Sequence, residues 1–122
     1  MKIVCVGGGP AGLYFAISAK LRDPDHDITV IERNPAGVTY GWGVTFSDPL
    51  LDSLYRNDPR SARKIFDSPS SWGNQEVHVR GDQMAHLGGY GFASGRKHLL
   101  DILVQRAIKL GVDVQLDRGM EA

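Results

Sequence analysis

The sequence has little cysteine and no excess of charge of either sign. Its one cysteine, Cys5, cannot form an internal disulfide and lies in the first apolar run, where a small buried strand residue is expected. Fourteen basic residues balance fourteen acidic ones, which gives no general attraction for nucleic acid or an anionic membrane. No apolar run has the length of a membrane span or a signal peptide, and the four histidines show no metal-ligand spacing. These absences predict a cytoplasmic protein that binds neither nucleic acid nor membrane and holds no metal.

Glycine, by contrast, is abundant, and the first cluster of it stands in an ordered context. A β-branched run over Ile3–Val6 predicts a strand buried on both faces of a parallel sheet. Apolar residues at helical spacing predict a helix over Ala11–Arg22, and Ile28–Ile31 predicts a second buried strand. Strand, glycine turn, helix and strand make one βαβ unit, which predicts an α/β fold with parallel strands.

The turn between the first strand and the helix carries the pattern G-x-G-x-x-G, made by the six residues Gly7, Gly8, Gly9, Pro10, Ala11 and Gly12. Gly7 permits the tight turn, Gly9 lets the backbone approach a pyrophosphate, and Gly12 lets helix and strand pack closely. The helix N-terminus then offers unpaired N–H groups to the phosphates. Because this turn follows a strand and opens a helix, it predicts a dinucleotide site.

Glu32 closes the second strand, 20 residues after Gly12, where a carboxylate can accept hydrogen bonds from ribose hydroxyls. The same carboxylate would repel a 2′-phosphate, so the site favours FAD or NAD over NADP. Arg33 has three open interpretations: it faces a phosphate, stacks on adenine, or lies solvated on the surface.

The rest of the chain shows no domain boundary, and we treat residues 1–122 as one domain. A turn is expected over Asn34–Gly37, and irregular chain around Gly41 and Gly43. Further along, the sequence predicts these elements: helices over Asp48–Leu54 and Asp58–Phe66, a break over Ser68–Ser71, a hairpin of Glu76–Arg80 with Gln83–Leu87, a loop over Gly88–Gly91, a helix over Gly95–Leu110 with Ser94 as N-cap, and a strand over Val112–Leu116.

The predicted long helix begins with three basic residues, Arg96, Lys97 and His98. Positive charge in the first turn opposes the helix dipole by up to about 1 kcal/mol. The cations either hold an anion there or form a solvated basic face, and the residues alone leave both interpretations open.

Four stretches resemble the group A flavoprotein monooxygenases, and within them the hydroxylases of aromatic acyl-CoA thioesters, of the salicylyl-CoA 5-hydroxylase and 2-aminobenzoyl-CoA monooxygenase type. The stretches are Lys2–Phe15, Val30–Asn34, Gly41–Asp48 and Gly91–Leu103. The glycine motif and Glu32 are shared by many FAD and NAD proteins. The Gly-x-Gly-Val-x-Phe-Ser-Asp segment and the helix led by Arg96 are more specific.

The resemblance implies the N-terminal part of a Rossmann-like FAD-binding domain of the glutathione-reductase type, incomplete and with a small hairpin insertion. It also implies an FAD-dependent enzyme that uses NADPH and O2 to hydroxylate a small aromatic substrate, in this type a CoA thioester. Arg96 would lie by the flavin, and Gly43 and Val44 near it. The family's later Gly-Asp motif and its substrate domain have no counterpart here, so we expect activity only together with the remainder of the same polypeptide. An NAD-dependent oxidoreductase and a non-catalytic dinucleotide-binding module stay as alternatives.

Overall fold

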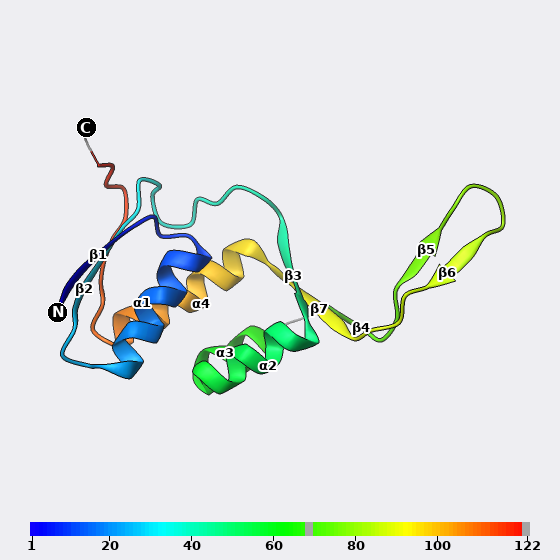
Figure 1. Ribbon diagram of the computed structural model, residues 1–122. Helices are drawn as coiled ribbons and strands as arrows, with labels where there is room; N and C mark the ends of the chain where they lie inside the picture. Colours follow the sequence, from blue (N-terminus) through cyan, green and yellow to red (C-terminus); the bar gives the residue numbers. More distant parts are fainter. Residues whose placement is uncertain (68–69, 121–122) are drawn as a thin grey trace. The chain divides into compact units, whose positions relative to one another are not determined.

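The computed structural model describes residues 1–67 and 70–120, and the chain divides into two compact units (Figure 1). The first unit is Met1–Trp42 together with the chain from Gly95 onward, and the second is the intervening Gly43–Ser94. The second unit is therefore an insertion into the first. The sequence shows no boundary at either junction, and the insertion contains much more than the small hairpin that we expected.

A parallel sheet forms the centre of the first unit, as predicted. Its strands are β1 (Lys2–Val6), β2 (Asp27–Ile31) and β8 (Asp113–Gln115), with β2 in the middle. Both neighbours of β2 run parallel to it. The third predicted strand has therefore joined the sheet beside β2, and the carboxyl ends of all three strands lie at the same edge.

Two helices, α1 (Pro10–Arg22) and α4 (Arg96–Lys109), pack against each other and against one face of this sheet (Figure 1). The buried core of the unit lies between the helices and the sheet. It consists of apolar side chains from α1, β2 and α4 and of one residue just before β8: Leu13, Ala16, Ile17, Ile28, Val30, Leu99, Ile102, Leu103, Ala107 and Val112. The helical periodicity predicted this face correctly. The packing brings the N-terminal ends of both helices to the edge of the sheet where β1 and β2 end.

The prediction that β1 is buried on both faces is wrong for the described residues. Ile3 and Cys5 pair with the buried Ile28 and Val30 on the face that the helices cover. Val4 and Val6 point to the opposite face, where they are 54% and 67% exposed. Cys5 is half-buried, and this burial raises the pKa of its thiol.

The second unit combines short helices with short strands. Its elements are β3 (Gly43–Ser47), α2 (Asp48–Asn57), α3 (Pro59–Phe66), β4 (Ser70–Trp72), β5 (Glu76–His78), β6 (Met84–His86) and β7 (Gly91–Gly95). The strands β3, β7 and β4 form a sheet with β7 in the middle, and β5 pairs with β6. The ring of Phe92 on β7 lies 5.0 Å from that of Phe46 and 4.4 Å from that of Phe66. This aromatic cluster joins the sheet to the helices of the unit.

Several predicted boundaries in this part of the chain are wrong. Strands β3, β4 and β7 stand where glycine and serine led us to expect irregular chain, and part of the predicted break, residues 68 and 69, lies outside the described residues. Helix α2 continues to Asn57, with Ser47 as its N-cap. Helix α4 has Gly95, the last residue of β7, as its N-cap, whereas Ser94 lies one residue earlier in β7 and is buried.

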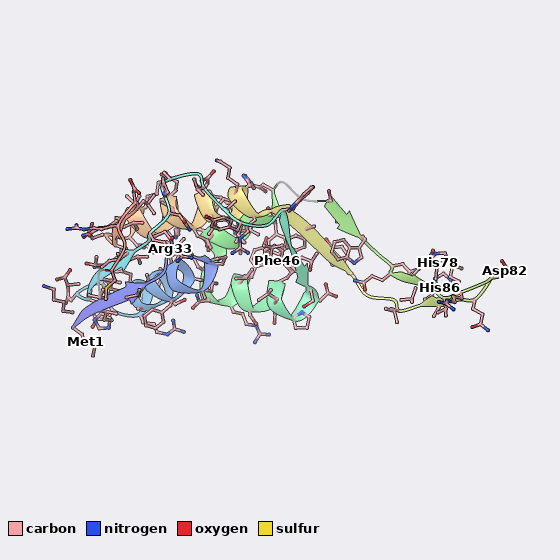
Figure 2. The ribbon with its side chains drawn as sticks, turned by 90° about the horizontal axis from the view of Figure 1, so that it is seen from above. Met1, Arg33, Phe46, His78, Asp82 and His86 are labelled. Carbon is pink, nitrogen blue, oxygen red and sulfur yellow. The ribbon has the colours of Figure 1, made fainter. Side chains whose placement is uncertain are left out.

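The predicted hairpin is confirmed, with β5 and β6 paired antiparallel. Figure 2 shows Asp82 at its turn, with His78 and His86 near each other on its strands. Glu76 lies between these imidazoles, at 3.4 Å from Nε2 of His78 and 3.6 Å from Nδ1 of His86. In the described parts of the chain, no group of three or more His, Cys, Asp or Glu side chains is arranged to hold a metal ion. No helix among the described residues is long and apolar enough to cross a membrane.

Candidate functional site

The glycine turn connects the end of β1 to α1, and two of its glycines are required by the protein's own packing. A Cβ atom on Gly12 would lie 2.1 Å from the carbonyl oxygen of Gly7, which is a backbone atom that cannot move aside cheaply. A Cβ atom on Gly8 would lie 2.8 Å from Cβ of Glu32. The turn itself needs a φ of +109° at Gly7. Close packing thus explains Gly8 and Gly12 without reference to a ligand.

Gly9 is different, because the place where its Cβ would be is open. Among the described residues, apart from Gly9 and its two neighbours in the chain, no heavy atom comes within 4 Å of that position, and Gly9 has an ordinary φ of −72°. Gly9 is the N-cap of α1, whose first turn begins with Pro10 and contains no acidic residue. The helix therefore presents its N-terminal N–H groups and the positive end of its dipole to open space. An anion can approach the backbone there.

Glu32 lies beside this turn and holds it in place. Its Oε2 accepts a hydrogen bond of 2.7 Å from the backbone N–H of Gly8, and its Oε1 accepts one of 2.8 Å from that of Asn34. The bond from Asn34 makes the largest contribution to a lowered pKa of the Glu32 carboxyl, and partial burial opposes it. The carboxylate thus connects the glycine turn to the chain after β2. Each of its oxygens keeps a further lone pair for another donor.

Replacing Glu32 with glutamine is expected to lower the free energy of unfolding by roughly 1 kcal/mol at neutral pH, because one amide oxygen cannot accept both bonds. A carboxyl with a lowered pKa stabilises the fold above the ordinary glutamate pKa of about 4.3, and that stabilisation is lost as the pH falls through the lowered value. The difference between the wild-type protein and Glu32→Gln should therefore shrink at acidic pH. Urea unfolding between neutral pH and pH 3 measures it, and a difference that is constant across this range would contradict the account.

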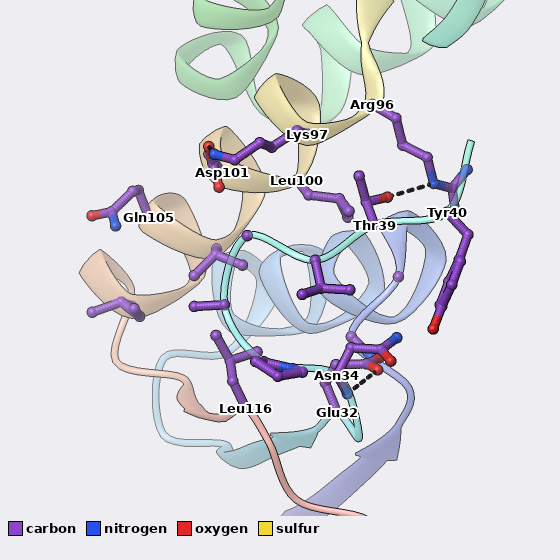
Figure 3. Close-up of a pocket in the computed structure, with 18 residues that line it drawn as sticks. Glu32, Asn34, Thr39, Tyr40, Arg96, Lys97, Leu100, Asp101, Gln105 and Leu116 are labelled. Carbon is purple, nitrogen blue, oxygen red and sulfur yellow. Dashed lines mark hydrogen bonds and ion pairs between the residues drawn. The ribbon is translucent and has the colours of Figure 1, made fainter. Parts of the chain in front are cut away.

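A cavity of about 620 Å³ opens beside the glycine turn, entirely within the first unit. Gly8, Gly9 and Glu32 line it at the sheet edge, and Arg96 lines it from the first turn of α4 (Figure 3). The loop of residues 34–40 lines it as well, and Nε of Arg96 donates a hydrogen bond of 3.1 Å to Oγ1 of Thr39 in this loop. Neither α1 nor α4 has an acidic residue in its first turn or a side-chain cap. The N-terminal ends of both helices thus contribute positive potential to one cavity.

The other predicted residues occupy three different places. Arg33 lines a second cavity of about 280 Å³ on the other side of Glu32, together with Gly7 and Arg118. Pro10, Ala11 and Gly12 form the first turn of α1. Gly43 and Val44 open β3 in the second unit and are not among the described residues that line either cavity.

Sequence reasoning missed the loop of residues 34–40 as a wall of the large cavity. Thr39 and Tyr40 lie in it, and its turn is closed by a bond of 3.2 Å from the N–H of Val38 to the carbonyl oxygen of Pro35. The cluster Asn34-Pro35-Ala36-Gly37 predicts a turn and was interpreted only in that way. No periodicity or motif indicates where the turn folds back to, so the sequence carries no direct signal for these lining residues.

Two known proteins with similar sequences are named as a hydroxylase and a monooxygenase. It is 40% identical over 116 residues to salicyloyl-CoA 5-hydroxylase from a Streptomyces species, which covers 94% of the chain and 22% of that protein. It is 30% identical to 3-hydroxy-4-methyl-anthranilyl-[aryl-carrier protein] 5-monooxygenase from Streptosporangium sibiricum, over 92% of the chain and 32% of that protein. No protein-family model matches the sequence. The chain thus spans less than a third of the length of either relative.

Solved structures show the same fold. The structure of 2-methyl-3-hydroxypyridine-5-carboxylic acid oxygenase matches with a TM-score of 0.81 and 23% identity, over 95% of the chain and 31% of that protein. The structure of p-nitrophenol 4-monooxygenase from Pseudomonas putida matches with a TM-score of 0.80 and 18% identity, over 94% of the chain and 31% of that protein. These matches confirm an α/β fold with a parallel sheet. The resemblance to hydroxylases and monooxygenases that the sequence motifs indicate is confirmed by the two relatives, with this chain corresponding to a part of such proteins.

Proposed function

We propose that this chain forms the FAD-binding part, of the glutathione-reductase type, of a monooxygenase that hydroxylates an aromatic substrate. The observation that carries the proposal is the open space at Gly9. This glycine caps a helix without acidic residues in its first turn, and the adjoining cavity extends from Glu32 to Arg96. A pyrophosphate binds by close contact with the backbone N–H groups at such a helix N-terminus. The ribose of the nucleoside attached to it is bound by a carboxylate. The residues present therefore fit FAD.

Each predicted residue then has a role in binding. The backbone N–H groups of Gly9, Ala11 and Gly12 surround the pyrophosphate, and Pro10, which has no N–H, fixes the backbone geometry at the first helical position. Glu32 accepts hydrogen bonds from ribose hydroxyls with the lone pairs that Gly8 and Asn34 leave free. Arg33 lies on the adenosine side. We assign Arg96 to the flavin end, and Gly43 and Val44 to the neighbourhood of the flavin, on the resemblance described above.

When bound, FAD supplies the chemistry that transfers one oxygen atom from O2 to an electron-rich ring, with NADPH as the reductant. The residues of this chain bind and orient the cofactor and contribute to the exclusion of water. We assign no catalytic base among them. The binding of the aromatic substrate belongs, in this proposal, to the remainder of the same polypeptide, since the chain corresponds to only 22% of the hydroxylase relative.

The names of the two relatives suggest a class of substrate. One acts on salicyloyl-CoA and the other on an anthranilyl group attached to an aryl-carrier protein, so both substrates are aromatic acyl groups on a carrier. We extend this to the present protein and propose an aromatic acyl thioester, with CoA as the first carrier to test.

An NAD-dependent oxidoreductase is the second candidate, because Glu32 suits the ribose of NAD as well as that of FAD. A non-catalytic dinucleotide-binding module is the third. Oxygen consumption distinguishes all three. The intact protein, supplied with NADPH and salicyloyl-CoA, is expected to consume O2 and release a hydroxylated thioester. Reduction or oxidation of a nicotinamide without O2 uptake would favour the dehydrogenase, and no turnover with a panel of aromatic thioesters would favour the module.

A further inference from the structure

Of the three basic residues Arg96, Lys97 and His98, Arg96 is the one that lines the cavity and has no ion pair with a carboxylate among the described residues. Of its two basic neighbours, Lys97 forms an ion pair of 2.8 Å with Asp101 one turn along α4, and His98 is exposed and does not line the cavity. Within the described parts of the chain, no carboxylate pairs with Arg96, whose polar partner is the hydroxyl of Thr39. A positive charge at a helix N-terminus is unfavourable unless an anion meets it. Arg96 is therefore suited to a ligand that carries negative charge.

We infer that Thr39 is a positioning residue that aims the Arg96 guanidinium at this ligand. The hydrogen bond from Nε of Arg96 to Oγ1 of Thr39 joins residues 57 positions apart, and both line the cavity (Figure 3). A guanidinium has five N–H donors in a rigid plane. The bond to Thr39 uses the N–H on Nε. The four N–H donors on the two terminal nitrogens stay available, and these are the donors that bind phosphates and other anions in a bidentate way.

The backbone next to Thr39 also lies close to Arg96. The N–H of Arg96 donates a hydrogen bond of 3.2 Å to the carbonyl oxygen of Trp42. Gly41 has a φ of +97°, and a Cβ atom there would lie 3.5 Å from Cδ of Arg96. The segment of residues 39–42 thus accepts hydrogen bonds from the backbone N–H and from Nε of Arg96, and a side chain at position 41 would meet the stem of this arginine. A side chain that would otherwise sample many rotamers is held in one orientation, which reduces the entropy lost when a ligand binds.

This inference rests on the proposed FAD site, and a double-mutant cycle on the intact protein tests it. FAD is removed and its dissociation constant is measured by titration for the wild type, Thr39→Val, Thr39→Ser, Arg96→Met and the double variant Thr39→Val/Arg96→Met. Valine keeps the shape of threonine and removes the hydroxyl, whereas serine keeps the hydroxyl. We expect Thr39→Val to weaken FAD binding about three- to tenfold, as the loss of one hydrogen bond to a charged group predicts, and Thr39→Ser to bind within about twofold of the wild type. In the Arg96→Met background, Thr39→Val should have no further effect.

Three results would overturn the inference. Equal losses for valine and serine would mean that the hydroxyl is irrelevant, and equal losses from Thr39→Val with and without Arg96 would mean that Thr39 acts on the structure and not through Arg96. A wild-type protein that binds no FAD would overturn the proposed function and this role together. That last result differs from the first two, in which the wild type binds FAD and only the role of Thr39 fails.

Discussion

Replacing Gly12 with alanine is expected to lower the free energy of unfolding by about 2 kcal/mol or more and to abolish cofactor binding. Alanine is the better helix former by up to about 1 kcal/mol, which alone would predict stabilisation. The new methyl group, however, would lie 2.1 Å from the carbonyl oxygen of Gly7, whereas real Cβ contacts are longer than 3.0 Å. The helix or the turn must move by about 1 Å, and overpacking of this kind costs roughly 1–3 kcal/mol and occasionally more. The clash therefore outweighs the gain in propensity.

Urea unfolding of the intact protein, followed by circular dichroism, measures this change. A Gly12→Ala protein with the stability of the wild type would show that the turn can relax at little cost. In that case the close contact between the first turn of α1 and Gly7 would not explain why glycine occupies this position.

Replacing Gly9 with alanine should leave the fold intact and weaken FAD binding at least about tenfold, which is about 1.4 kcal/mol. Beyond its two neighbours in the chain, no heavy atom of the described residues lies within 4 Å of the added methyl group, and the φ of −72° suits alanine. Alanine is a poorer N-cap than glycine, but it also reduces the entropy of the unfolded chain by about 0.4–1 kcal/mol, so the two effects on stability nearly offset each other. The methyl group would instead occupy the space that a pyrophosphate needs.

The two glycine variants are matched controls, because the same substitution is made twice in one turn. Gly12→Ala should lose stability and cofactor together, whereas Gly9→Ala should lose only cofactor. Titration of FAD into both cofactor-free proteins, alongside urea unfolding, separates the effects. Normal FAD affinity in Gly9→Ala would mean that the ligand does not approach the backbone at this point.

The first unit could be predicted from the sequence because its signals are local. A β-branched run, a glycine turn and a helical stripe each predicted one element correctly, and the glycine turn and Glu32, which were assigned to one site, line the same cavity. The double attachment of Glu32 was not predictable in the same way. Its bonds to Gly8 and Asn34 depend on the side-chain orientation at the end of β2, which a residue pattern does not specify.

The helices and the hairpin of the second unit were predicted, but its sheet of β3, β7 and β4 was missed because these strands are short and rich in small residues. Strand β7, Gly91–Gly95, contains two glycines and a serine, yet it is the central strand of its sheet and carries the buried Phe92. Tertiary contacts, including the aromatic cluster around Phe92, override the weak strand propensity of these residues. The hydrogen bond between Thr39 and Arg96 was missed for a related reason, since no sequence signal connects positions 57 residues apart.

The proposed site is defined above all by the identity of the cofactor that it binds. The intact protein should be purified without added cofactor, its visible spectrum recorded, and the molecule that it releases on heating identified by chromatography and mass. We predict flavin absorption bands and the stoichiometric release of FAD, with much less FAD in Gly9→Ala prepared in parallel. Release of NAD, or of no nucleotide from a protein that also fails to take up added FAD, would contradict the proposed site and the function built on it.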